Sequence, residues 1–90
     1  MGTALITIKL MPVSPEVNLD EIKEKAKALI EEKQGKNTRF EEQPVAFGLK
    51  AVIVYFDIDE SVDLDPIEEE LGKIENVNSS QVTDMRRAFG

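Results

Sequence analysis

Few side chains in this sequence could take part in covalent or metal chemistry. The chain has no histidine and no cysteine, so the commonest general base and the usual thiolate ligands and nucleophiles are missing. The acidic residues between 57 and 68 have nearly the spacing of a calcium-binding loop, but Val62 occupies the sixth position, where such a loop needs glycine. We therefore expect a solvated turn and a helix cap, followed by an exposed helix face at Glu68, Glu69 and Glu70. We predict no catalytic residue, no metal site and no bound cofactor.

A first candidate for partner binding is the segment Gln43–Lys50. Pro44 stiffens the chain and Gly48 permits a sharp turn, so the phenylalanine between them, Phe47, would be displayed as a contact residue. The alternative is an ordinary hairpin connection in which Phe47 folds back over the core. The sequence leaves both interpretations open.

A second candidate is the basic segment near the C-terminus. Arg86 and Arg87 are the only adjacent arginines in a chain whose formal net charge is -7. They either recognise a carboxylate or phosphate group on a partner or form a solubilising tail. Phe89 is a large apolar side chain close to the chain end, and we expect it to pack on this domain or on a partner.

Strand and helix patterns position these segments. From Thr3 to Met11 the residues alternate in polarity with period two, which predicts a strand with one buried face. From Asn18 to Ile30 the apolar residues recur at helical spacing. Asn18 can cap the start of this helix, and Gly35 follows its end.

The rest of the chain adds three strands and one helix. We predict a charged edge strand at Thr38–Glu42 and a central, buried strand at Leu49–Ile58. Asp65 followed by Pro66 predicts the start and cap of a second helix. The segment Val77–Met85 predicts a last, more polar strand with a basic tail beyond it. This order predicts a ferredoxin-like α+β fold, βαββαβ, with a four-stranded antiparallel sheet and both helices on one face.

We further expect the first and third strands to be parallel neighbours. With that topology the loop Pro44–Gly48 and the chain end Asp84–Gly90 emerge at the same end of the sheet. The phenylalanine turn and the two arginines would then meet in space.

The composition limits the class of partner and the location. A net charge of -7 argues against unspecific binding to RNA or DNA, which depends on clustered Lys and Arg, and favours a basic protein partner. The apolar run Ala51–Phe56 is far shorter than the roughly 20 residues of a membrane helix. The N-terminus has no signal-peptide pattern. We therefore expect a cytoplasmic protein whose residues 1–90 form a single domain.

Three segments, Ile8–Pro12, Pro44–Ala51 and Val82–Arg87, together resemble archaeal translation elongation factor 1-beta, and the likeness covers essentially the whole chain. The resemblance implies a guanine-nucleotide exchange domain that promotes GDP release and GTP loading on elongation factor 1-alpha, the GTPase of polypeptide elongation. It implies action by protein contact without covalent chemistry, with the nucleotide bound by the partner. The alternative for this architecture is a small-ligand-binding regulatory module of ferredoxin-like fold.

The resemblance also implies which residues contact the GTPase. The Ala46–Gly48 turn matches a contact surface of the family, and the C-terminal segment matches the part that reaches the magnesium site of the GTPase. Eukaryotic members have a near-terminal lysine there, whereas this chain has Gly90 at about that position, so we expect Arg86 or Arg87 to supply the cation. The predicted partner-binding residues are Pro44, Ala46, Phe47, Gly48, Lys50, Asp84, Arg86, Arg87 and Phe89.

Overall fold

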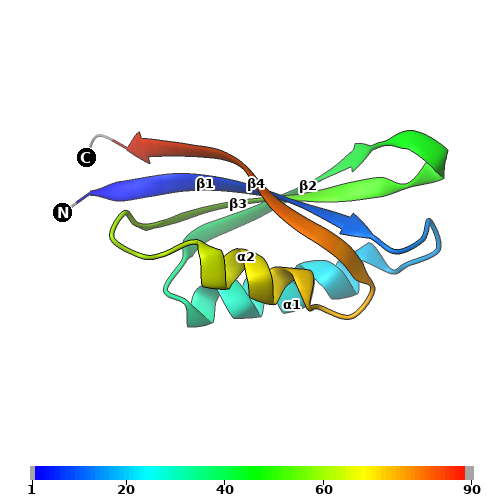
Figure 1. Cartoon of the computed structure of the whole chain (residues 1–90), viewed down its shortest axis with the longest axis horizontal. Coiled ribbons are helices and arrows are strands. Elements are labelled where there is room, and N and C mark those ends of the chain that lie inside the picture. The colour runs from blue at the N-terminus through cyan, green and yellow to red at the C-terminus, as the bar shows by residue number, and fades with distance from the viewer. Residues whose placement is uncertain (1, 89–90) are drawn as a thin grey trace.

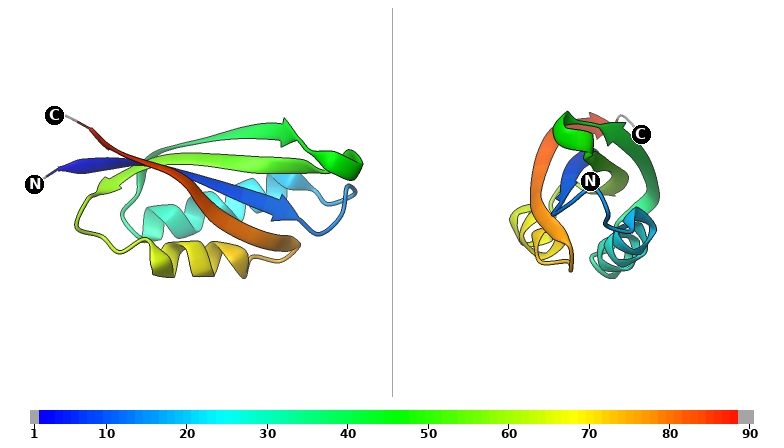
Figure 2. Two further views of the ribbon diagram at one scale, coloured as in Figure 1. Left: turned by 45° about the horizontal axis from the view of Figure 1, so that its top comes forward. Right: turned by 90° about the vertical axis from the view of Figure 1, so that its right-hand side faces the viewer.

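A computed structural model describes residues 2–88 and contains one sheet and two main helices (Figure 1). The elements are β1 Thr3–Pro12, α1 Leu19–Glu32, β2 Lys36–Pro44, β3 Lys50–Asp59, α2 Asp65–Gly72 and β4 Val77–Ala88. A single 3-10 turn, Ala46–Gly48, joins β2 to β3. Both helices lie under the same face of the sheet, as Figure 2 shows from two directions. The predicted ferredoxin-like βαββαβ fold is confirmed. Among residues 2–88 no helix is both long and apolar enough to cross a membrane.

The strand order is β2-β3-β1-β4, and every neighbouring pair is antiparallel. The prediction that the first and third strands run parallel is therefore wrong. A helix crosses over between β1 and β2, so these two strands point the same way, and the β2–β3 hairpin then reverses the chain. Consequently β3 runs against β1, and the hairpin turn lies at the end of the sheet where β1 finishes.

The core lies between the sheet and the helices and follows from the alternation of the two central strands. Apolar residues at every second position of β1 and β3 face the helices, which present their own apolar stripes. The largest contributors are Ile6, Ile8 and Leu10 from β1, Val52, Val54 and Phe56 from β3, Ile22 and Ile30 from α1, and Ile67 and Leu71 from α2. The opposite face of the sheet has no helix over it within residues 2–88 (Figure 2).

The predicted cap of the first helix is confirmed, and its exit differs in detail. The Oδ1 atom of Asn18 accepts a hydrogen bond from the Asp20 N–H at 3.0 Å. After the helix, Gln34 rather than Gly35 takes the left-handed conformation, with φ of 73°. The Gly35 N–H bonds the Ile30 carbonyl at 2.8 Å, and this close approach needs glycine because a Cβ there would overlap Ile30 Cγ2.

The second helix departs from the predicted capping and exposure. The prediction that Asp65 caps this helix is wrong, because Asp65 is its first residue and the cap position, Leu64, makes no side-chain hydrogen bond. The Asp63 carboxylate accepts a hydrogen bond from the Asp65 N–H at 3.1 Å. Glu68 and Glu70 are half-buried rather than exposed, and only Glu69 has the predicted exposure. Glu70 forms an ion pair with Lys33, the residue that follows α1, with 2.9 Å between the carboxylate oxygen and Nζ. The acidic run therefore contributes to packing as well as to solubility.

Glu68 connects α2 to the irregular part of β4. The pairing of β4 with β1 shifts by one residue at Thr83, which is the mark of a β-bulge. Next to this bulge the Val82 N–H donates to Glu68 Oε2 at 2.7 Å, and the Ser80 hydroxyl donates to the Glu68 carbonyl. The helix thus supplies a hydrogen-bond acceptor for the Val82 N–H, which the pairing of β4 with β1 leaves without one.

Replacing this acceptor tests its contribution to stability. Glu68→Ala leaves the part-buried Val82 N–H without a partner and is expected to lower the free energy of unfolding by about 1–3 kcal/mol. Glu69→Ala, on the exposed side of the same helix, should change it by less than about 0.5 kcal/mol. Urea denaturation followed by far-UV circular dichroism measures both values. Equal effects of the two substitutions would contradict this role of Glu68.

Candidate functional site

The turn between β2 and β3 displays an aromatic side chain at the tip of a hairpin. The Val45 N–H bonds the Leu49 carbonyl at 2.8 Å, and the Leu49 N–H bonds the Ala46 carbonyl at 3.3 Å. Phe47 has a left-handed backbone, with φ of 63° and ψ of 30°, and its side chain is 93% exposed. The interpretation in which Phe47 folds back over the core is therefore wrong. A left-handed conformation is rare for an aromatic residue, and such strain is concentrated at functional sites.

The other predicted residues of this segment surround the turn. Pro44 and Lys50 are paired where the hairpin closes, and both are exposed. Ala46 and Gly48 flank Phe47 and are also exposed, and Gly48 has a φ of 74° with no atom near the place of a Cβ. The segment therefore forms one continuous accessible tip.

The predicted basic tail is part of a strand. Asp84, Arg86 and Arg87 lie within β4, which continues to Ala88 instead of ending at Met85. Arg86 is paired with Leu5 and Arg87 with Ala4, so the two side chains leave opposite faces of the sheet. The predicted contact residue Phe89 lies outside the described residues.

Each arginine has an acidic neighbour. Arg86 Nε donates to Asp84 Oδ2 at 2.8 Å, within the same strand. Arg87 Nε lies 3.1 Å from Glu60 Oε2, at the turn that follows β3. These ion pairs hold both guanidinium groups close to the strand.

The phenylalanine turn and the arginines do not meet. β4 runs antiparallel to β1, so Arg86 and Arg87 lie beside the start of β1, whereas the hairpin turn lies at the end where β1 finishes. Figure 1 shows the hairpin at one end of the molecule and the start of β1 and the end of β4 at the other. The molecule is 41 Å long. The prediction that these segments come together is wrong because it depended on a parallel first and third strand.

The helix-free face of the sheet carries a cluster that the sequence analysis did not single out. We call it the open face and define it by Leu5, Ile53, Tyr55, Glu41 and Arg39. The Tyr55 hydroxyl donates to Glu41 Oε2 at 2.6 Å, and the Arg39 guanidinium lies 5.9 Å from the centre of the Tyr55 ring. Ile53 is buried although it is not part of the helix-side core, and Leu5 is 38% exposed. The signal was available, because Leu5 occurs among the polar positions of an alternating strand.

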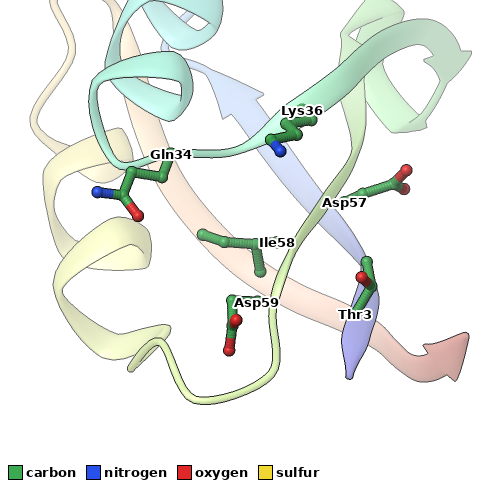
Figure 3. Close-up of a pocket in the computed structure, with 6 residues that line it drawn as sticks. All are labelled: Thr3, Gln34, Lys36, Asp57, Ile58 and Asp59. Carbon is green, nitrogen blue, oxygen red and sulfur yellow. The ribbon is translucent and has the colours of Figure 1, made fainter. Parts of the chain in front are cut away.

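A hollow beside the start of β2 does not form a converging site. It is lined by Thr3, Gln34, Lys36, Asp57, Ile58 and Asp59. Figure 3 shows the Asp57 side chain pointing away from those of Gln34, Ile58 and Asp59. Asn37 Nδ2 donates to Asp57 Oδ2 at 2.7 Å, and Asp59 Oδ1 accepts from Ser61. Each carboxylate that lines the hollow therefore has one bonded oxygen, and Asp57 Oδ1 is buried without a hydrogen-bond partner among residues 2–88.

The acidic stretch after β3 is a turn, as predicted. Asp59 Oδ1 accepts hydrogen bonds from the N–H of Ser61 at 2.9 Å and from its hydroxyl at 2.7 Å, and these bonds lower the pKa of the Asp59 carboxyl. Within residues 2–88 no group of three or more acidic side chains is arranged to hold a metal ion.

Comparison with known proteins identifies the family. A sequence model described as the EF-1 guanine nucleotide exchange domain matches residues 5–88. The chain belongs to this family. The exchange-domain match includes the hairpin tip and the arginines of β4, and it confirms the resemblance found in the sequence.

Full-length relatives carry one name. The chain is 44% identical over 82 residues to the elongation factor 1-beta of Pyrococcus abyssi, covering 89% of each chain. It is 42% identical over 88 residues to that of Methanosarcina acetivorans, covering 97% of this chain and 99% of the relative. It is 38% identical over 86 residues to that of Methanococcus maripaludis, covering 94% and 97%. These similarities support guanine nucleotide exchange on elongation factor 1-alpha as the function of this exchange domain.

The open face of the exchange domain can be probed through its tyrosine. The hydrogen bond to Glu41, together with burial, raises the pKa of the Tyr55 phenol above its ordinary value. A raised phenol pKa stabilises the folded state below the unfolded pKa of about 10. This contribution is lost as the pH rises through the folded pKa.

Substitution of the acceptor should lower this pKa. Glu41→Ala removes both the hydrogen bond and the negative charge, so the pKa of Tyr55 is expected to fall towards about 10. Absorbance titration reports it directly, because the chain has one tyrosine and no tryptophan. Glu42→Ala is the control, since Glu42 pairs with Lys23 at 2.7 Å instead. A Tyr55 pKa that is unchanged by Glu41→Ala would contradict the proposed cause.

Proposed function

We propose that this chain is the exchange factor for elongation factor 1-alpha in its own cell, where it promotes GDP release and GTP loading in the cytoplasm during polypeptide elongation. The observation that carries the proposal is the exchange-domain match over residues 5–88, together with relatives of nearly the same length. On this proposal residues 1–90 form one exchange domain. The partner is a protein, and the chain needs no contact with nucleic acid or membrane, in keeping with its net charge of -7.

The exchange reaction makes and breaks no covalent bond. The factor accelerates GDP release because it binds the nucleotide-free GTPase more tightly than the GDP-bound form, since only differential affinity shifts an equilibrium. The nucleotide stays with the GTPase throughout. What this chain must supply is a rigid surface that fits the GTPase after the magnesium and phosphate contacts have loosened.

Two regions at opposite ends of the molecule are proposed to make that contact. At one end Phe47, held out by its left-handed turn, enters an apolar pocket of the GTPase. At the other end an arginine of β4, Arg86 or Arg87, brings a positive charge to the magnesium site. Pro44, Ala46, Gly48, Lys50 and Asp84 border these two groups and complete the contact, and Phe89 is proposed to extend it.

A small-ligand-binding module is less well supported. The described hollows are shallow and open, and in the one with two carboxylates the Asp57 side chain points away from those of Gln34, Ile58 and Asp59 (Figure 3). One oxygen of each carboxylate is already bonded, to Asn37 or to Ser61. An exposed phenylalanine and exposed arginines suit a macromolecular partner better.

The direct test follows a fluorescent GDP analogue leaving elongation factor 1-alpha in magnesium, chased by excess GTP. Substoichiometric amounts of this protein are expected to raise the release rate severalfold or more, because a catalyst acts on many GTPase molecules in turn. No acceleration by the folded protein, with an active GTPase, would refute the proposed function.

Phe47 gives a sharper test at the hairpin tip. Phe47→Ala should slow exchange by about ten-fold or more, the usual effect of removing an aromatic anchor. Its free energy of unfolding should change by less than about 0.5 kcal/mol, because the side chain is exposed. Val13→Ala removes another exposed apolar side chain that lies outside the hairpin and serves as the control. Full exchange activity of Phe47→Ala would remove Phe47 from the contact.

A further inference from the structure

The alternation of β4 separates its exposed residues into two sets. Arg86 is paired with Leu5, and both lie on the open face. Arg87 is paired with Ala4 and Met85 with Ile6, residues whose side chains face the helix layer, so Arg87 and Met85 lie on that side. A partner that lies flat on one face of the sheet contacts one set and not the other, because the sheet lies between them. Docking on the open face and docking on the helix side therefore predict different effects on exchange when adjacent residues of β4 are substituted.

We propose that the GTPase docks across the open face of the sheet, so that Arg86 is the contacting arginine and Arg87 is not. This inference rests on the proposed function and resolves the choice that it leaves between the two arginines. It adds Leu5 and Tyr55 to the contact surface, with the buried Ile53 beneath them. None of these residues belongs to the hairpin tip or to the C-terminal segment.

The shape of the open face supports this docking mode. One shallow hollow includes Gln43 and Pro44 of the hairpin together with Ile53 and Tyr55. The next hollow shares Tyr55 and Thr7 and continues to Leu5, Asp84 and Arg86. The open face is thus a continuous path between the two proposed contact ends. The opposite face of the sheet is covered by α1 and α2 (Figure 2).

The side chains of the open face are held in place before any partner binds. The hydrogen bond between Tyr55 and Glu41 and the position of Arg39 beside the Tyr55 ring fix the centre of the surface. A preordered surface loses less side-chain entropy on binding. Leu5, which is 38% exposed, adds apolar area beside the tyrosine, whereas Ile53 is buried beneath this surface and supports it. Apolar area next to an aromatic ring suits the centre of a protein interface.

The surroundings of the two arginines also differ. Arg87 reaches from β4 to Glu60, whose N–H bonds the Gly2 carbonyl at 3.0 Å, so this pair ties the strand end to the turn after β3. Arg86 pairs with Asp84, a neighbour on the same strand, and their side chains are 75% and 46% exposed. Arg87 is as exposed as Arg86, at 78%, but its partner Glu60 is only 34% exposed and belongs to another segment. The exposed Arg86–Asp84 pair is weak, so Arg86 can exchange its partner for an acidic group of the GTPase at little cost.

A second copy of this chain is a poorer occupant of the open face. Each molecule has a net charge of -7, and like net charges oppose association. In a dimer formed across the open face, the exposed Phe47 at the hairpin tip would also have no evident contact with the second copy.

Matched substitutions on the two faces test the proposal by exchange kinetics. Leu5→Lys is expected to slow GDP release by about ten-fold or more, because it places a charge in a desolvated contact. Met85→Lys is the control, since Met85 is 63% exposed on the other face, and it should leave exchange unchanged. Arg86→Gln should slow exchange at least about ten-fold more than Arg87→Gln does, because only the Arg86 charge would lie in the interface with the GTPase. The reverse order in both comparisons would overturn the proposal.

Methyl NMR measures docking independently of exchange. On addition of the nucleotide-free GTPase, the methyl signals of Leu5 and Ile53 should shift or broaden while the Met85 methyl signal is unaffected. Perturbation of Met85 alone would overturn the proposal while leaving the exchange function intact. Absence of both binding and exchange in the wild type would instead refute the proposed function on which the inference rests.

Two further measurements complete the test. Thermal unfolding shows whether the Leu5→Lys variant folds. If that variant does not fold, the exchange rate of Arg86→Gln, a substitution at an exposed position, decides whether the GTPase docks on the open face. Sedimentation velocity of the free protein should show a monomer. A dimer abolished by Leu5→Lys and unaffected by Met85→Lys would show that a second copy occupies the open face, and would overturn the proposal.

Discussion

The antiparallel pairing of β1 with both β3 and β4 is the constraint from which the rest of the structure follows. β1 supplies Ile6, Ile8 and Leu10 to the centre of the core, and its two neighbours are fixed in register against it. A shift by one residue would turn these side chains to the open face, so the register is strongly specified. Because both neighbours run against β1, the hairpin tip and the end of β4 are placed at opposite ends of a molecule 41 Å long.

Local patterns in the sequence were sufficient for the elements and the fold class, but not for strand direction. The alternation in Thr3–Met11 and the helical spacing after Asn18 show which side chains of each segment are buried against a neighbouring layer. This information is local to each segment. Whether β3 runs with or against β1 depends on the number of chain reversals between them. Counting the crossover and the hairpin would have given the antiparallel answer from the predicted order alone. The error therefore lay in the topology and not in the reading of residues.

The details of the site that the sequence did not provide depend on contacts between distant segments. Nothing near Met85 indicates that β4 continues through Arg86 and Arg87, because the continuation depends on pairing with Leu5 and Ala4 of β1. The half-burial of Glu68 accompanies its hydrogen bond to Val82, 14 residues later in the chain and next to the bulge of β4. The exposure of Phe47 was one of two interpretations that Pro44 and Gly48 left open, and only the structure decides between them.

Within residues 2–88 the sheet of this small domain is covered by helices on one face only, so one face forms the core and the other is available for the proposed contact with the GTPase. The helix side holds the apolar core that a chain of 90 residues needs, and it leaves the other face free of that task. On the proposed function, a rigid sheet that contacts the GTPase at both ends fixes the distance between two parts of the partner. A GTPase conformation that matches this distance is bound more tightly than one that does not, and this difference in affinity is what drives GDP release. The length and stiffness of the sheet would then matter as much as any single contact residue.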